Sequence, residues 1–331
     1  MSKLNEGKLT IEQLKRLVFK NISSFRKEVL THPYIGQDCG LFDPANNIIS
    51  ISSDPITGAT ENIGRLSVEI NLNDIAASGA EPFAITVTLL CPIGTKEEEI
   101  KKIMKEIDET AKEKNVQVIG GHTEVTSSVN RIIVSITALG IINRETYDEN
   151  IEIQEGFDIY ITKDAGLEGT YIIGTEKENE LKDILDEEDM NKLKKYSTLL
   201  SVIEDAKLAK NSGALLMHDI TEGGILGAVW ESCELVGFGA KIYKEKISIS
   251  NTTKKISNHF NINPLKLISS GSLLFFASKE NRKEIELAFQ DKEIELSRIG
   301  VITKEKEIVL IDKGKEIIVE KPQSDELYKV I

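Results

Sequence analysis

Five short segments of the sequence place acidic, histidine or amide side chains beside glycines or next to apolar runs. They read GQDCG, SSDP, NLND, GGHTE and HDITEGG, and they supply Asp38, Asp54, Asn71, Asp74, His122, Glu124, Asp219 and the glycines Gly120, Gly121, Gly223 and Gly224. Oxygen ligands spread over several loops are typical of magnesium–phosphate sites, because Mg²⁺ accepts one or two carboxylates and completes its octahedron with water and phosphate oxygens. Glycine lets the backbone approach such a ligand closely. The pattern indicates a magnesium-dependent site.

Each of these residues also has a purely structural explanation. An Asp beside a glycine or at a strand end commonly forms a turn or caps a helix, and Gly120–Gly121 is compatible with a tight turn. His122 and His218 could be hydrogen-bonded loop histidines, and Asn71 could satisfy backbone groups. The sequence contains neither a Walker A lysine motif nor a GxGxxG after a strand. Spacing alone therefore does not identify the ligand.

The composition excludes several classes of partner. The 331 residues carry a formal charge of −13, which argues against nucleic-acid and anionic-membrane surfaces and means that metal must screen any bound phosphate. No apolar run is long enough to cross a bilayer, and the start MSKLNEGKLT lacks the features of a signal peptide, so we expect a cytoplasmic protein. Cys39, Cys91 and Cys233 are far apart and odd in number, which predicts packed thiols and neither a disulfide framework nor a zinc site.

The elements that must position these side chains alternate between strands and helices. Strands are predicted for NIISISS (47–53), which ends at Asp54, FAITVTLL (83–90), VQVI (116–119), which stops at Gly120, RIIVSITALGII (131–142), FDIYITK (157–163) and ALLM (214–217). A helix with Thr95 as N-cap and Glu98 in a capping box carries the apolar residues Ile100, Ile103, Met104, Ile107 and Ala111. Another is predicted from Gly224, with the apolar stripe Ile225, Leu226, Val229, Trp230 and Cys233.

The segment RLSVEINLND (65–74) has two possible structures. Its alternating apolar residues fit a half-buried strand. It continues, however, into a glycine at position 79 and a proline at position 82, which suit the end of a helix. Asn71 and Asp74 are three residues apart, so they share a face only in a helix. We predict a helix, which lets both side chains reach one ligand.

In chain order, several motifs resemble one known family. Gly-x-Asp, Ser-Asp-Pro, IGRLSVEINLNDIAASGAEP, GGHTEVT, HDITEGGILGA and LISSGSLLF extend from about Gly36 to the SRIGVIT region. They resemble the aminoimidazole ribonucleotide synthetase superfamily, which includes thiamine monophosphate kinase, selenophosphate synthetase and the hydrogenase-maturation carbamoyl dehydratase. The long helical motif is highly specific to this superfamily, and HDITEGGILGA is most similar to the hydrogenase-maturation branch.

The resemblance implies a fold of the α/β class (α+β type) in two domains. An N-terminal ATP-binding and dimerisation domain, 1–150, would pair its mixed sheet with a second copy into a barrel-like homodimer, and a C-terminal α/β domain, 151–331, would follow. Asp38, Asp54, Asp74 and Asp219 would be the metal and phosphate positions, supported by Asn71. Gly120, Gly121, Gly223 and Gly224 would line the ATP site, and Asp219, His122 and Glu124 would be catalytic. ATP and Mg²⁺ are the implied cofactors.

Three departures from the family pattern limit the choice of branch. The chain ends DELYKVI, without the C-terminal cysteine of the carbamoyl dehydratase branch, so it would not carry out that branch's covalent carrier chemistry. His122 occupies a position after the double glycine where the kinase and dehydratase branches have an acid, and Glu124 could replace that acid. No reactive cysteine precedes Cys39, unlike in selenophosphate synthetase.

Three functions are therefore expected. The first is an ATP-dependent enzyme that activates an oxygen of a small or carbamoyl-type acceptor by phosphoryl transfer, which requires positioning and charge neutralisation more than a strong base. The second is a kinase of the thiamine monophosphate type. The third is a nucleotide-binding accessory protein that assists a maturation-factor partner without turnover.

Overall fold

The computed structural model describes residues 7–8, 13–29, 47–56, 62–147, 152–322 and 324–331. The chain divides into an N-terminal unit, Met1–Ala76 with Ala80–Tyr147, and a C-terminal unit, Ala77–Gly79 with Asp148–Ile331. Asp38 and Cys39 lie outside the described residues. No helix in the described ranges is long and apolar enough to span a membrane.

The N-terminal unit is built on a mixed five-stranded sheet in the order β1-β4-β3-β5-β2. The strands are β1 (Gly7–Lys8), β4 (Gln117–Thr126), β3 (Glu81–Pro92), β5 (Ile133–Asn143) and β2 (Asn47–Ile56). Within the described part of this sheet, β3 and β4 are the one parallel pair. Among the same residues β2, which carries Asp54, pairs with β5 alone and is therefore an edge strand.

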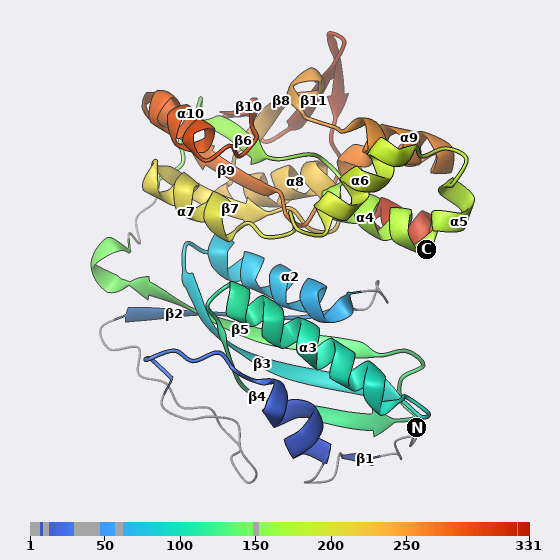
Figure 1. Cartoon of the computed structure of the whole chain (residues 1–331). Helices are drawn as coiled ribbons and strands as arrows, with labels where there is room; N and C mark the ends of the chain where they lie inside the picture. Colours follow the sequence, from blue (N-terminus) through green and yellow to red (C-terminus); the bar gives the residue numbers. More distant parts are fainter. Residues whose placement is uncertain (1–6, 9–12, 30–46, 57–61, 148–151, 323) are drawn as a thin grey trace. The chain divides into compact units, whose positions relative to one another are not determined.

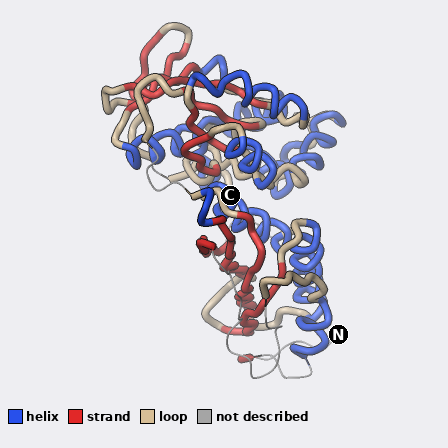
Figure 2. The backbone as a smooth tube through the Cα atoms, turned by 90° about the vertical axis from the view of Figure 1, so that its left-hand side faces the viewer, coloured by secondary structure: helices blue, strands red, loops and turns tan. Residues whose placement is uncertain are grey.

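Two helices cover one face of this sheet, as both views of the backbone show (Figures 1 and 2). They are α2 (Ile63–Ala77) and α3 (Glu97–Glu113). The segment 65–74 is thus helical, as its spacing and its helix-end signals predicted, because α2 buries residues on most of its circumference, including Leu66, Val68, Leu72 and Ile75.

The helix α3 confirms the predicted apolar stripe and corrects its first turn. Ile100, Ile103, Met104, Ile107 and Ala111 are all buried. The N-cap is Lys96, whose N–H donates to Glu99 Oε2 at 2.8 Å, whereas the Thr95 hydroxyl donates back to Pro92 O. The predicted box of Thr95 with Glu98 was therefore one residue too early, because the preceding turn uses the Thr95 hydroxyl.

The C-terminal unit contains a mixed seven-stranded sheet in the order β12-β11-β8-β10-β6-β9-β7. Its strands are β12 (Lys315–Ile318), β11 (Ile308–Asp312), β8 (Gly239–Tyr243), β10 (Leu296–Thr303), β6 (Asp158–Thr162), β9 (Leu273–Ala277) and β7 (Ala214–Asp219). The helices are α4 (Leu167–Glu176), α5 (Glu178–Leu181), α6 (Glu187–Tyr196), α7 (Ile203–Asn211), α8 (Gly224–Val236), α9 (Asn251–Phe260) and α10 (Arg282–Asp291).

Side chains from both faces of β6 are buried, which explains its nearly continuous apolar sequence. Ile159 and Ile161 belong to the same core cluster as the α8 stripe, in which Ile225, Leu226, Val229 and Cys233 are buried and Trp230 is half-buried. On the other face Tyr160 stacks on Phe275, with ring centroids 5.0 Å apart, and Phe275 stacks on Phe289 of α10. The predicted stripe of α8 is therefore confirmed.

These two α/β units with mixed sheets confirm the predicted fold class. The barrel-like dimer that the resemblance implies stays a prediction.

Candidate functional site

Asp54 lies within β2, not at the end of a strand. The pairing with β5 continues through Asp54, Pro55 and Ile56, which lie opposite Ile136, Ser135 and Val134. The prediction that the strand ends at Asp54 was wrong. Asp-Pro is a local turn signal, and here the long partner strand β5 overrides it.

Asn71 of α2 fixes the backbone of Asp54. Its Oδ1 accepts the Asp54 N–H at 2.8 Å, and its Nδ2 donates to Asp54 O at 3.2 Å and to Ser67 O at 2.9 Å. The amide thus pairs with the open edge of β2 as a neighbouring strand would. Since Asn71 is fully buried and all its polar functions bind backbone, it positions Asp54 rather than contacting a ligand.

Asp74 of α2 reaches the same strand. Its Oδ2 accepts a hydrogen bond of 2.5 Å from the Ser52 hydroxyl. Ser52 and Asp54 are two residues apart in β2, so their side chains point to the same face of the sheet, toward α2. The side chain of Asp54 is exposed and Asp74 is half-buried. The structure therefore places Asn71 and Asp74 on the face of α2 that contacts β2, as their helical spacing predicted, and adds that Asp54 is on the strand they contact.

Gly120 and Gly121 lie in the middle of β4, so the predicted strand end at Gly120 was wrong. Gly121 has φ +155°, and a Cβ there would lie 2.0 Å from Val87 O, so close packing against β3 requires glycine. A Cβ on Gly120 would have no atom within 4 Å among the described residues, which leaves room for close approach by a ligand. The bulge between Ile85 and Thr86 of β3 marks where the pairing register shifts.

His122 and Glu124 point away from the Asp54 group. Asp54, Ile136, Val87 and Gly121 occupy one row across the four long strands, so His122, the next residue, faces the opposite side of the sheet. His122 Nε2 lies 3.2 Å from Glu124 Oε2, and both side chains are 38% exposed. The structure therefore pairs the two predicted catalytic residues with each other on the open face.

The helix α8 begins at Gly224, as the sequence predicted, whereas β7 continues two residues beyond the predicted end at Met217 and ends at Asp219. The Asp219 side chain is 3% exposed, and its buried Oδ2 has no hydrogen-bond partner among the described residues. Asp219 and Thr221 do not cap α8, whose N-cap is Gly223 without a side-chain bond. Burial would lower the pKa of His218, but its contacts with Asp219 and Glu231 outweigh burial and raise that pKa.

The two glycines that start α8 have internal roles. The Gly223 N–H donates to Asp325 Oδ2 at 2.6 Å, and the Gly224 N–H donates to Thr221 O at 3.1 Å. Both residues have positive φ, +83° and +61°, which favours glycine. Contact of Gly223 and Gly224 with the cofactor stays a prediction. In this structure both N–H groups donate hydrogen bonds within the protein.

Glu168 is a buried acid in the first turn of α4 that the sequence analysis missed. It is 2% exposed, and its Oε2, like Asp219 Oδ2 and Ser270 Oγ, lacks a hydrogen-bond partner in the described chain. Burial raises its pKa to about 7; nearby Ser270 opposes this rise, while the charges of Asp325 and Asp219 add to it. The signal available in the sequence was a single acid among small and apolar residues in AGLEGT.

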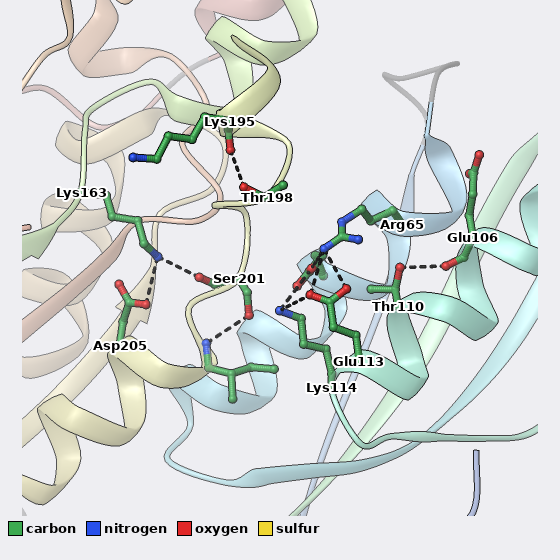
Figure 3. A network of polar contacts seen from close by, with 12 residues as sticks. Arg65, Glu106, Thr110, Glu113, Lys114, Lys163, Lys195, Thr198, Ser201 and Asp205 are labelled. Carbon is green, nitrogen blue, oxygen red and sulfur yellow. Dashed lines mark hydrogen bonds and ion pairs between the residues drawn. The ribbon is translucent and has the colours of Figure 1, made fainter. Parts of the chain in front are cut away.

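Ion pairs join α2 to the end of α3, as Figure 3 shows for Arg65, Glu113 and Lys114. Glu69 is 1% exposed and lies 3.2 Å from Arg65 Nη2 and 3.4 Å from Lys114 Nζ. Burial raises the pKa of Glu69, although both cations oppose this shift. These contacts hold the helix that carries Asn71 and Asp74 against its neighbour.

A polar cavity of about 900 Å³ lies in the C-terminal unit and includes none of the predicted site residues. Two of its carboxylates are already satisfied. Asp164 accepts from the Ser248 and Tyr196 hydroxyls at 2.7 and 3.3 Å, and Asp189 accepts from the Thr252 hydroxyl at 2.8 Å and pairs with Lys255. The cavity is therefore separate from the residues that the motifs select.

Within the described ranges, no three His, Cys, Asp or Glu side chains converge on a point that could hold a metal ion. Asp54 and Asp74 belong to the N-terminal unit, Asp219 belongs to the C-terminal unit, and Asp38 lies outside the described residues. The exposed Asp54 carboxylate and the unpartnered Asp219 Oδ2 still suit Mg²⁺, because this ion uses few carboxylates and fills its shell with water and phosphate oxygens.

Cys91 and Cys233 are fully buried, and burial raises the pKa of each thiol to about 12. The prediction that these two cysteines are packed is confirmed. Cys233→Ser should leave any ATP turnover unchanged, while the buried hydroxyl lowers the free energy of unfolding by about 1–2 kcal/mol. Steady-state rates and urea denaturation measure the two effects. Complete loss of turnover in a folded variant would instead indicate a thiol mechanism.

Family models match most of the chain. The model of the AIR synthase related protein N-terminal domain matches residues 36–142, and that of the C-terminal domain matches residues 154–313. The chain belongs to the AIR synthase-related family. A protein of Methanocaldococcus jannaschii named for hydrogenase expression and formation is 32% identical over 286 residues, which cover 83% of this chain and 81% of the relative. Thiamine-monophosphate kinase of Pyrococcus abyssi is 26% identical over 281 residues, with coverages of 81% and 84%.

Solved structures of this family share its fold. The crystal structure of E. coli HypE, a hydrogenase maturation protein, has a TM-score of 0.81 at 15% identity and covers 97% of this chain and 100% of that chain. A HypE structure in complex with ATP has a TM-score of 0.79 at 15% identity, with coverages of 97% and 96%. A HypE–HypF complex gives 0.69 at 21% identity, with coverages of 83% and 91%. The family models confirm the predicted membership of the superfamily, and these structures show that the fold is shared.

Proposed function

We propose that this AIR synthase-related chain is an ATP- and Mg²⁺-dependent enzyme that activates an oxygen of a small or carbamoyl-type acceptor by phosphoryl transfer. The observation that carries the proposal is the join between α2 and β2, where Asn71 fixes the Asp54 backbone and Asp74 binds Ser52. This join holds two carboxylates of the family motifs on one face of the sheet. A HypE structure in complex with ATP, of the same fold, supports the choice of nucleotide.

Asp54, Asp74 and Asp219 would hold the metal, with Asp38 as a further proposed ligand. Bound Mg²⁺-ATP supplies the γ-phosphoryl group and the positive charge that neutralises the developing transition state. The protein itself contributes positioning. The Asn71 side-chain amide hydrogen-bonds the backbone N–H and C=O of Asp54, so the Asp54 carboxylate projects from a fixed strand. The proposal assigns no step to His122 or Glu124, because they face the other side of the sheet.

The proposal extends to partners and location. The half-exposed face of the N-terminal sheet, with His122, Thr88 and Ser135, is where a second copy would pair to form a barrel-like homodimer. The N-terminal domain, 1–150, would then serve ATP binding and dimerisation in a cytoplasmic enzyme, and the C-terminal α/β domain, 151–331, would follow it. A maturation-factor partner is proposed because a HypE–HypF complex is known for the same fold.

A kinase of the thiamine monophosphate type is the second candidate. Its support is the 26% identity to the Pyrococcus abyssi kinase over 81% of this chain. The two candidates differ in their product. A kinase releases a stable phosphorylated acceptor, whereas the acceptor-activating enzyme proposed first uses its phosphorylated acceptor up in the next step. Incubation with ATP and thiamine monophosphate, followed by ³¹P NMR, separates them.

Mg²⁺-ATP binding by the purified chain tests the proposal. Wild-type protein should bind with a magnesium requirement and release ADP slowly, not AMP. Asp54→Asn and Asp219→Asn should each weaken binding by about tenfold or more while the fold is retained, because each removes one charge from the metal shell. Calorimetric titration gives the affinities and circular dichroism checks the fold.

Asp291→Asn is the matched control for these two variants, because it removes an exposed carboxylate at the end of α10. It should bind like wild type. Wild-type affinity in both Asp54→Asn and Asp219→Asn would overturn the metal assignment. A wild-type chain that binds no Mg²⁺-ATP at millimolar concentration would overturn the catalytic proposal and leave a scaffold role. Binding without turnover would instead indicate the nucleotide-binding accessory protein.

A further inference from the structure

One buried carboxylate fastens the C-terminal turn (residues 325–329) to two loops of the C-terminal unit. Asp325 is 2% exposed and accepts three backbone hydrogen bonds. The Leu327 N–H, at 2.8 Å, is the ordinary N-cap bond of the turn. The Gly223 N–H at 2.6 Å and the Ile268 N–H at 3.2 Å come from segments 102 and 57 residues away in sequence. Asp325 therefore does more than cap its own turn.

The start of α8 needs an acceptor from elsewhere because its own residues cannot supply one. Gly223 is the N-cap, and a glycine has no side chain to bond the first N–H groups. Gly224 cannot be replaced by a capping residue either, since a Cβ there would lie 2.7 Å from both Leu265 O and Leu267 O. Asp325 supplies an acceptor at this helix start, because its Oδ2 accepts the N–H of the N-cap residue Gly223 itself.

Neighbouring residues of the C-terminal turn contact the same two loops. Glu326 Oε2 accepts the Asn263 N–H at 3.1 Å, and the Tyr328 hydroxyl donates to Glu222. Leu327 is 5% exposed. The loop 220–224, which follows Asp219, and the loop 263–268 are therefore joined to each other through the turn as well as by direct packing.

We infer that Asp325 is a positioning residue for the nucleotide site and that it acts by holding the loop 220–224 in the geometry that follows Asp219. The effect of Asp325 on nucleotide binding rests on the proposed function. The hydrogen bonds by which Asp325 joins the two loops, here called the clamp, are present in the structure whatever that function is. The C-terminal turn then forms part of the support of the site, and Asp325 affects nucleotide binding without contacting the nucleotide.

Two variants and one control test this role. Asp325→Ala removes all three acceptor contacts, and Asp325→Asn keeps one acceptor oxygen. Lys329→Ala leaves Asp325 intact and removes one ion pair of the same turn, 2.7 Å long, between the exposed Lys329 and the buried Glu326. Hydrogen exchange is followed in peptides that cover 220–227 and 263–268, and Mg²⁺-ATP affinity is measured on the same full-length proteins. We expect exchange in both peptides to accelerate about tenfold or more in Asp325→Ala, with Asp325→Asn in between and Lys329→Ala unchanged.

Mg²⁺-ATP affinity should weaken in the same order, while exchange in β10 and α10 stays at the wild-type rate. Wild-type exchange of 220–227 in Asp325→Ala would overturn the clamp. Faster exchange with wild-type affinity would overturn the positioning role, since the turn would then be a structural support only. If Asp325→Ala does not fold, Asp325→Asn against Lys329→Ala makes the same comparison. A wild-type chain without Mg²⁺-ATP affinity would refute the proposed function separately, and the exchange data would still decide on the clamp.

Discussion

Replacement of Lys163 by methionine should lower the free energy of unfolding of the C-terminal unit by about 3–5 kcal/mol, the range for breaking a buried ion pair. The Lys163 side chain is 12% exposed and that of Asp205 is 3% exposed, and Nζ lies 2.9 Å from Asp205 Oδ2 (Figure 3). Nζ also donates to Ser201 O at 2.8 Å and to Gly271 O at 2.7 Å. Methionine keeps the length of the side chain but leaves Asp205 as an unpaired buried charge.

Denaturation followed by tryptophan fluorescence measures this effect, because the single tryptophan, Trp230, is in α8 of the C-terminal unit. Lys292→Met is the matched control, since Lys292 and Glu204 form an exposed pair in the same unit, with side chains 57% and 50% exposed. It should change stability little. The double variant Lys163→Met with Asp205→Leu should recover part of the loss, because no charge is left unpaired. A loss below about 1 kcal/mol in Lys163→Met would contradict the buried-pair account.

Glu168→Gln should stabilise the protein in a pH-dependent way. The folded-state pKa of Glu168 is raised from 4.5 to about 7, chiefly by burial, so the folded state binds this proton more tightly than the unfolded state. The wild type therefore loses stability as pH rises from about 4.5 to about 7, by about 3 kcal/mol at one pKa unit per 1.36 kcal/mol. Glutamine resembles the protonated acid and cannot ionise, so the variant should gain that amount above pH 7 and nothing below pH 4.5.

Unfolding free energies between pH 5 and pH 8 measure the difference between the Glu168→Gln variant and wild type. Glu234→Gln is the control, because Glu234 is an exposed acid of α8 whose replacement should give the same pH profile as wild type. A constant difference between Glu168→Gln and wild type across this range would show that Glu168 does not titrate with a raised pKa.

Elements decided by short-range spacing were predicted well from the sequence. The apolar stripe of α3 and the common face of Asn71 and Asp74 follow from helical periodicity, because residues three and four apart meet on one face whatever surrounds them. Strand ends were predicted poorly. The β2 strand continues past Asp54 and β4 continues through Gly120 and Gly121, because pairing with β5 and β3 outweighs the local turn preference of proline and glycine.

The sequence by itself determined the family, the α/β class and the set of motif carboxylates, because these depend on residue types in a fixed order. Only the tertiary structure decided which face each side chain occupies. It separated His122 and Glu124 from Asp54, since a strand that runs on through Gly121 sends successive side chains to opposite faces. It also revealed Lys163, Glu168 and Asp325, whose roles depend on burial beside partners distant in sequence. Burial changes the free-energy cost of an unpaired charge by several kcal/mol. The order of residues along the chain does not show which charged side chains are buried.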